Sequence, residues 1–167
     1  MIAEVKCDKC RAECCRNSVI PLNIIDLKKI LYHVKEYNAV DVDSRFKVIE
    51  HNGKPLVAIN DPSEGLPQIY LASPCAFLNE DNLCSLHKLQ VKDKEFAEYL
   101  DTLELSRDIK PLACRAHPYF FDNNEGISRW ADCRNTKSSF PVEDKNLEWI
   151  VHEKDICTVL QKNQKLF

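Results

Sequence analysis

Apolar residues near the start of the chain recur with the period of an α-helix. They stand at i, i+3, i+4 and i+7, on one helical face, and are Leu27, Ile30, Leu31 and Val34. Asn23 precedes them as a candidate N-cap. Asp26 puts a carboxylate in the first turn, where the positive end of the helix dipole favours it. The pattern predicts an amphipathic helix over residues 24–37.

Two other parts of the chain have the pattern of a β-hairpin. Residues 46–50 and 56–59 are rich in apolar side chains and flank an Asn-Gly pair, which type I′ turns prefer. Residues 119–121 and 127–131 flank a polar turn at 122–126. We expect each pair of segments to form two antiparallel strands.

Shorter signals predict the remaining elements. Residues 18–22 and 68–71 are expected to be short strands, and residues 88–100 carry enough apolar positions for a helix. A C-terminal helix is expected over about 141–163, with Ser139 as its cap. Helices combined with short hairpins predict a small α+β fold. A chain of 167 residues suits a single domain, residues 1–167, with one hydrophobic core.

The composition is that of an ordinary folded protein, with 44% hydrophobic and 29% charged residues. A formal charge of −3 provides no broad basic field, so we expect no nucleic-acid partner. No apolar run approaches the roughly 18 residues of a membrane span. The first residues also lack the apolar region of a signal peptide. These observations predict a cytoplasmic protein without a membrane partner.

Nine cysteines change this picture, because a reducing cytoplasm disfavours structural disulfides and favours metal ligation. Four of them stand within nine positions, at Cys7, Cys10, Cys14 and Cys15. In a helix the first three share one stripe and Cys15 points about 100° away from Cys14. In an extended chain these two neighbours face opposite sides. We therefore do not expect Cys14 and Cys15 to face the same centre.

Further cysteines follow in separate segments. Cys75 and Cys84 flank a polar Asn-Glu-Asp-Asn turn, an arrangement that resembles a hairpin holding two metal ligands. Cys114 precedes the second predicted hairpin, and Cys133 follows it. Thiolates are soft ligands that select zinc, iron and iron–sulfur clusters, so the cysteines predict a site for a metal ion as the partner of this chain.

In their order along the chain, the cysteine segments resemble a known family. They are Cys7-x2-Cys10-x3-Cys14-Cys15, Cys75-Ala-Phe-Leu, Cys84-Ser-Leu-His87, Lys110-Pro111-x2-Cys114-Arg115-x2-Pro118 and Cys133. Over roughly residues 5–135 they are similar to the zinc- or iron-chelating cysteine-cluster domains of the YkgJ-like or CxxCxxCC-type family. The chain differs in the three residues before Cys14, in Lys110 where Arg is usual, and in a longer Cys84–Cys114 connection that looks like a helical insertion.

The resemblance implies metal binding through eight cysteines, namely Cys7, Cys10, Cys14, Cys15, Cys75, Cys84, Cys114 and Cys133. Eight thiolates suffice for two four-ligand sites, or for one site with a reactive or structural remainder. Zinc and an iron–sulfur cluster both accept four thiolates, so the metal stays open, although the spacing does not match the ferredoxin runs. Disulfides are the alternative. We expect metal–thiolate bonds between these distant segments to hold the α+β fold together.

Three functions are compatible with this chemistry. The favoured hypothesis is a metal-binding protein whose zinc or iron centre is structural or serves in metal handling. An enzyme hypothesis has an iron–sulfur cluster in redox or group-transfer chemistry, with one iron left open by three thiolates at Cys7, Cys10 and Cys14. A third hypothesis is a thiol redox sensor in which Cys14 and Cys15 react.

Residues beside the cysteines are candidates for contacts around a metal centre. Arg115 follows Cys114 and either offsets thiolate charge or forms an ordinary salt bridge. His87 and His117 each stand three residues after a cysteine. That spacing allows ligation, but the resemblance implies Tyr or Phe at these positions, which favours a hydrogen bond to a ligand or a packed ring. Cys157 lies outside the pattern and is expected to be a buried apolar residue of the C-terminal helix.

Overall fold

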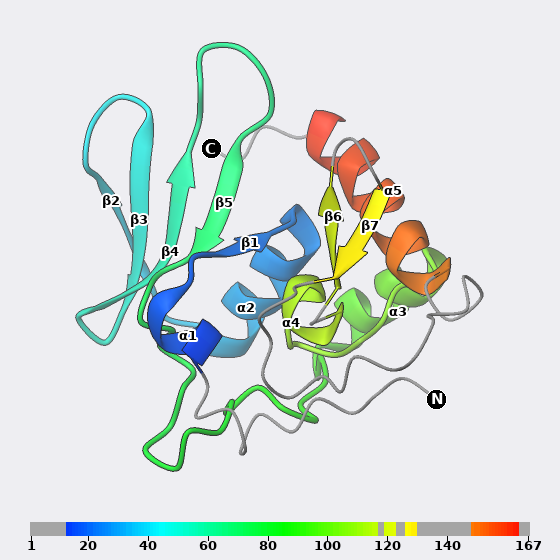
Figure 1. Ribbon diagram of the computed structural model, residues 1–167, viewed down its shortest axis with the longest axis horizontal. Coiled ribbons are helices and arrows are strands. Elements are labelled where there is room, and N and C mark those ends of the chain that lie inside the picture. The colour runs from blue at the N-terminus through cyan, green and yellow to red at the C-terminus, as the bar shows by residue number, and fades with distance from the viewer. Residues whose placement is uncertain (1–12, 117–118, 123–125, 130–147, 164–167) are drawn as a thin grey trace.

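We describe residues 13–116, 119–122, 126–129 and 148–163 of a computed structural model of the chain. Its larger sheet has five antiparallel strands in the order β1-β5-β4-β3-β2 (Figure 1). These are β1 (Ile20–Leu22), β5 (Gln68–Leu71), β4 (Lys54–Asn60), β3 (Phe46–His51) and β2 (Asn38–Asp41). A separate antiparallel pair contains β6 (Tyr119–Asp122) and β7 (Gly126–Arg129). The helices are α1 (Glu13–Asn17), α2 (Ile24–Val34), α3 (Lys94–Thr102), α4 (Leu112–Ala116) and α5 (Glu148–Asn163).

The predicted first amphipathic helix is confirmed as α2. Its start is a capping box, in which Asn23 Oδ1 accepts from the Asp26 N–H at 2.8 Å and Asp26 Oδ2 accepts from the Asn23 N–H at 3.3 Å. The helix ends at Val34, earlier than predicted, because Lys35 adopts a φ of 65° and donates its N–H back to the Leu31 carbonyl.

Both predicted hairpins are confirmed. Between β3 and β4, Asn52 and Gly53 have φ values of 52° and 71°, the left-handed conformations that a type I′ turn requires. The short strands β1 and β5 were also predicted, and they pair with each other. Strand β2 was not predicted, because all four of its residues are exposed and it therefore lacks an apolar face. It is held by its pairing with β3.

The helix predicted over residues 88–100 is wrong at its start, since α3 begins at Lys94. The Val91 N–H donates to the Arg107 carbonyl at 2.9 Å, which holds the preceding segment in a bridge to a later one. Asp93 then caps the helix by accepting from the Phe96 N–H at 2.8 Å. The C-terminal helix is confirmed as α5, while its predicted cap Ser139 and residues 141–147 lie outside the described residues.

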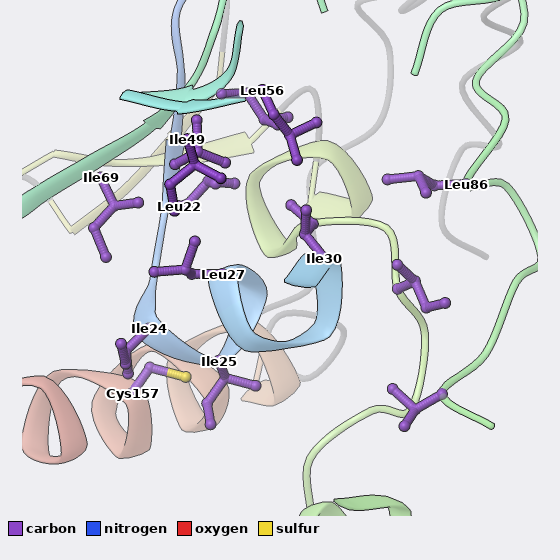
Figure 2. Packing of buried hydrophobic residues seen from close by; sticks show 14 of the residues in the cluster. Leu22, Ile24, Ile25, Leu27, Ile30, Ile49, Leu56, Ile69, Leu86 and Cys157 are labelled. Carbon is purple, nitrogen blue, oxygen red and sulfur yellow. The ribbon is translucent and has the colours of Figure 1, made fainter. Parts of the chain in front are cut away.

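The core lies between α2 and the five-stranded sheet. Ile25 and Ile30 of α2 and Ile49 and Val57 of the sheet are completely buried, and all four belong to one cluster. Figure 2 shows Cys157 of α5 beside Ile24 and Ile25, on the side of α2 that faces away from the sheet. Cys157 is 1% exposed, so its prediction as a buried apolar residue is confirmed. The fold is therefore α+β, with α2 packed between the sheet and α5.

None of the helices in the described part of the chain has the length and apolar character needed to cross a membrane.

Candidate metal centre

Three segments that are far apart in the sequence each contribute cysteines. Cys14 and Cys15 lie on α1, Cys75 and Cys84 on the connection after β5, and Cys114 on α4. A backbone hydrogen bond joins the first two segments directly, because the Cys75 N–H donates to the Cys15 carbonyl at 2.7 Å. Nearby, Ser73 Oγ donates to the Arg16 carbonyl at 3.1 Å. Cys75 is therefore fixed beside Cys15 by main-chain contacts.

Cys84 returns toward Cys75 through the polar turn between them. Asn79 Oδ1 accepts from the N–H groups of Asp81 and Leu83 at 3.0 and 2.9 Å, which reverses the chain. Leu78 and Cys84 form an isolated antiparallel bridge. In place of the predicted hairpin with two paired strands, the structure has, between Cys75 and Cys84, a tight turn closed by one bridge.

Cys114 lies on the five-residue helix α4, which is joined to α2 and α5 by specific polar groups. At its first residue, the Leu112 N–H is shared by the two Asp26 oxygens at 3.1 and 3.2 Å. Next to Cys114, the Arg115 guanidinium donates to the Lys110 carbonyl at 2.9 Å and to Glu153 Oε1 of α5 at 2.5 Å. Two buried carboxylates therefore hold the segment that carries Cys114.

Four of these thiols influence one another electrostatically in every pairing. The set, named here the thiol quartet, is Cys15, Cys75, Cys84 and Cys114. Burial, followed by the charges of Cys15 and Cys84, raises the pKa of Cys114. A hydrogen bond from Cys15 lowers the pKa of Cys75, while Cys114 and Cys84 act in the opposite direction. All four sulfurs therefore share one local environment.

Cys14 and Cys15 differ in how they relate to the thiol quartet. Their sulfurs are 4.0 Å apart. The hydrogen bond to Cys15 and then burial raise the pKa of Cys14. Among the described cysteines, Cys15 is the one whose side chain shifts this pKa. For Cys15, the hydrogen bond from Cys14 lowers the pKa, but Cys75, burial and Cys84 outweigh it and raise the pKa to about 12. Cys15 is therefore the member of this pair that faces the other segments.

The quartet has the donor chemistry of a soft-metal site. All four residues are half-buried, and none of the six described cysteines is in a disulfide. Within the part of the chain that the structure describes, no three His, Cys, Asp or Glu side chains have converged to the spacing of metal ligands. The donor set still fits zinc or iron, because thiols become thiolates when a cation replaces their protons.

The sequence left two roles open for Arg115, offsetting thiolate charge or forming an ordinary salt bridge. Its partner is Glu153, which is only 3% exposed, so the contact is a buried ion pair and not the surface salt bridge considered from the sequence. The guanidinium also lies over the Trp149 ring, 5.5 Å from its centroid. Offsetting thiolate charge beside Cys114 stays a prediction.

The remaining predicted site residues are placed only in part. The His87 side chain is exposed, and the main-chain N–H of this residue donates to the Cys84 carbonyl at 3.1 Å. Its role around a metal stays a prediction. Cys7, Cys10, Cys133 and His117 lie outside the described residues, so the sequence-based hypotheses that use them stand as predictions.

Sequence reasoning missed the two carboxylates that hold α4. Asp26 was correctly assigned to the first turn of α2, but nothing in the local pattern indicated that it also binds Leu112, 86 residues later. Glu153 stands on a helix face that also carries the buried Ile150 and Cys157. A charged residue on an apolar helix face is the one signal that could have marked it.

Comparison with known proteins found no matching curated protein and no matching solved structure. A family model with the description "Putative zinc- or iron-chelating domain", named CxxCxxCC, matches residues 6–136, which is well over half of the chain and includes all eight cysteines of the pattern. The chain therefore belongs to the CxxCxxCC family, also known as YkgJ-like, of zinc- or iron-chelating domains.

Proposed function

We propose that this protein binds a zinc or iron ion through the thiol quartet of Cys15, Cys75, Cys84 and Cys114. The observation that carries the proposal is that the fold joins cysteine segments far apart in the sequence, since the Cys75 N–H donates to the Cys15 carbonyl at 2.7 Å, while every pair within the thiol quartet is electrostatically coupled. Four thiolates are a complete ligand set for tetrahedral zinc or for an iron centre.

The charges around the quartet support binding of a cation-thiolate group. Four thiolates around a divalent ion leave a net charge of about −2, which nearby cations can offset. Lys110 already acts on Cys114 in this sense, since its charge lowers the pKa of that thiol. The ion would supply a cross-link between α1, the turn between Cys75 and Cys84, and α4, so its binding energy would add to folding energy.

The other four cysteines of the family pattern, Cys7, Cys10, Cys14 and Cys133, are available in this proposal for a second centre. Cys14 lies beside the quartet but is linked to it only through Cys15. This arrangement favours a divided set over one centre with eight ligands. An iron–sulfur cluster at either set, and a catalytic role based on it, are finer forms of the proposal that metal analysis distinguishes.

Elemental analysis of protein purified without oxygen tests the proposal. Zinc or iron should accompany the protein in stoichiometric amount, and an iron–sulfur cluster would add acid-labile sulfide and a brown colour. Cys84→Ala should lower the metal content by about one ion equivalent, because it removes one of four ligands. Cys157→Ala is the matched control, since it deletes a buried thiol of α5 that lies outside the quartet.

Protein that neither retains nor takes up zinc or iron would overturn the proposal. Equal metal content in Cys84→Ala and Cys157→Ala would overturn the quartet as the ligand set. A change in free-thiol count on oxidation, in protein without metal, would favour the thiol redox sensor instead.

A further inference from the structure

Asp26 makes more contacts than the start of α2 requires. Its side chain is 1% exposed, and one oxygen already completes the capping box by accepting from the Asn23 N–H. Both oxygens also accept from the N–H of Leu112, which lies on a different helix. One buried carboxylate therefore joins the first turns of α2 and α4.

The contact matters because α4 is too short to fix its own orientation. A helix of five residues has almost no internal hydrogen bonds, and the bond that closes its first turn runs from the Arg115 N–H to the Pro111 carbonyl at 2.9 Å. Pro111 has no N–H, so Leu112 is the first residue of the helix that offers one. Cys114 follows two positions later, within the same turn.

Two tethers thus fix this turn from different elements. Asp26 of α2 holds its first N–H, and Glu153 of α5 holds Arg115, the residue after Cys114. The Asp26 tether acts on the main chain, so it sets the place from which the Cys114 side chain starts. The Glu153 tether acts at the end of a long side chain and constrains the main chain less.

We propose that Asp26 is a positioning residue for Cys114, holding α4 so that this thiol meets the other three of the quartet. The inference rests on the proposed metal-binding function and adds to it a residue that is not itself a ligand. Partners that orient metal ligands commonly contribute about 10- to 100-fold to metal affinity. The alternative is that Asp26 serves only as a helix cap and affects stability alone.

The chain contains a matched control for that alternative. Asp93 also caps a helix, since its carboxylate accepts from the Phe96 N–H at 2.8 Å, but α3 carries no cysteine. Asp93→Ala and Asp26→Ala each remove a capping carboxylate, and a lost cap costs about 1 kcal/mol of stability. Only Asp26→Ala also removes a contact to the helix that bears Cys114.

The first measurement is the zinc affinity of the full chain, by competition with a chromogenic chelator. We expect Asp26→Ala to weaken zinc binding about 10- to 100-fold, and Asp93→Ala to leave it within about twofold. Asp26→Asn keeps one side-chain oxygen at the same place, so it should bind zinc more tightly than Asp26→Ala. It also guards against misfolding of the alanine variant, because the amide has nearly the same shape.

The second measurement needs no metal and separates the two proposals. The alkylation rate of each cysteine in the metal-free chain is followed by mass spectrometry of peptides. Asp26→Ala should change the rate of Cys114 severalfold relative to Asp93→Ala and leave Cys84 unchanged. If both aspartate variants bind zinc equally and alkylate Cys114 at the same rate, the positioning role is overturned. If the unaltered chain binds neither zinc nor iron, the metal-binding proposal fails, and the Cys114 rate alone decides the role of Asp26.

Discussion

Replacing Glu153 and replacing its buried partner Lys29 with uncharged residues should change the free energy of unfolding by very different amounts. Glu153 Oε1 contacts two cations at once, the Arg115 guanidinium at 2.5 Å and the Lys29 ammonium at 3.7 Å. The Lys29 side chain is completely buried, and in the described part of the chain its Nζ has no hydrogen-bond partner. Glu153→Gln leaves both cations without their shared anion, whereas Lys29→Met leaves Glu153 paired with Arg115.

The expected magnitudes follow from which charge is left uncompensated. Removing the single partner of a buried charge costs about 3–5 kcal/mol of unfolding free energy, and Glu153→Gln should lie in that range. Lys29→Met exchanges an ammonium without a hydrogen bond for an apolar chain of similar length, a replacement that is often neutral or stabilising. It should shift stability by no more than about 1 kcal/mol.

Asp26, the other buried carboxylate, increases the expected difference between the Glu153 and Lys29 variants. Burial raises the pKa of Asp26 to about 6, and Lys29 is the first of the charges that oppose the rise. Without Lys29 the pKa of Asp26 should rise further, so the carboxyl can take up a proton and remove the excess negative charge. Lys29 offers a similar but weaker escape in Glu153→Gln. Burial already lowers its pKa, so the cost of that variant should fall as the pH rises.

Urea unfolding at pH 7, followed by circular dichroism, measures both effects in one series. The double variant Lys29→Met with Glu153→Gln gives the coupling between the two sites. Equal losses in the two single variants would refute the reasoning, because they would mean that the 3.7 Å contact acts as an isolated pair and that Arg115 does not hold Glu153.

Three further predictions concern the same elements. In the folded protein the pKa of Asp26 is about 6, above its ordinary value of 3.8, so its contribution to the free energy of unfolding is greatest below pH 4 and is lost as the pH rises through 6. Between pH 4 and 7, the free energy of unfolding of Asp26→Asn should therefore rise by about 3 kcal/mol relative to that of the unaltered protein, measured by urea unfolding. Gly53→Val should cost about 1–2 kcal/mol in the same assay, because φ is 71° there. Chelation of bound metal should lower the melting temperature of the unaltered protein more than that of Cys84→Ala, measured by calorimetry.

Local sequence signals were sufficient wherever a structure depends on neighbouring residues. The Asn23 cap, the place of Asp26 in the first turn and the Asn52-Gly53 turn all depend on contacts within four residues, and all were predicted correctly. The start of α3 was missed because Val91 is held by Arg107, a contact that no local pattern reveals. Helix α4 was missed for a different reason, since five residues provide less than two turns of periodicity.

The candidate site shows the same division between chemistry and placement. Residue type and order predict that the cysteines bind metal, and the angle between adjacent helical residues predicts different centres for Cys14 and Cys15; both stay predictions. Which cysteines meet is a property of the tertiary fold, since Cys15 and Cys75 are joined by a main-chain bond between segments 60 residues apart. Such pairings leave no trace in either segment alone.

Asp26 shows why a sufficient local explanation can hide a tertiary one. Its place in the capping box accounts for an aspartate at this position, yet an exposed cap would do the same work without desolvation. Its burial instead makes the charged form costly at neutral pH, which is the physical meaning of a pKa of about 6. A carboxylate that weakens the fold while binding the main chain beside Cys114 is better explained by the position it imposes than by the stability it provides. Glu153 holds the other side of Cys114 through Arg115, and its ion pairs stabilise the fold as well. Asp26 is therefore expected to matter more for the geometry of the thiols than for the free energy of folding.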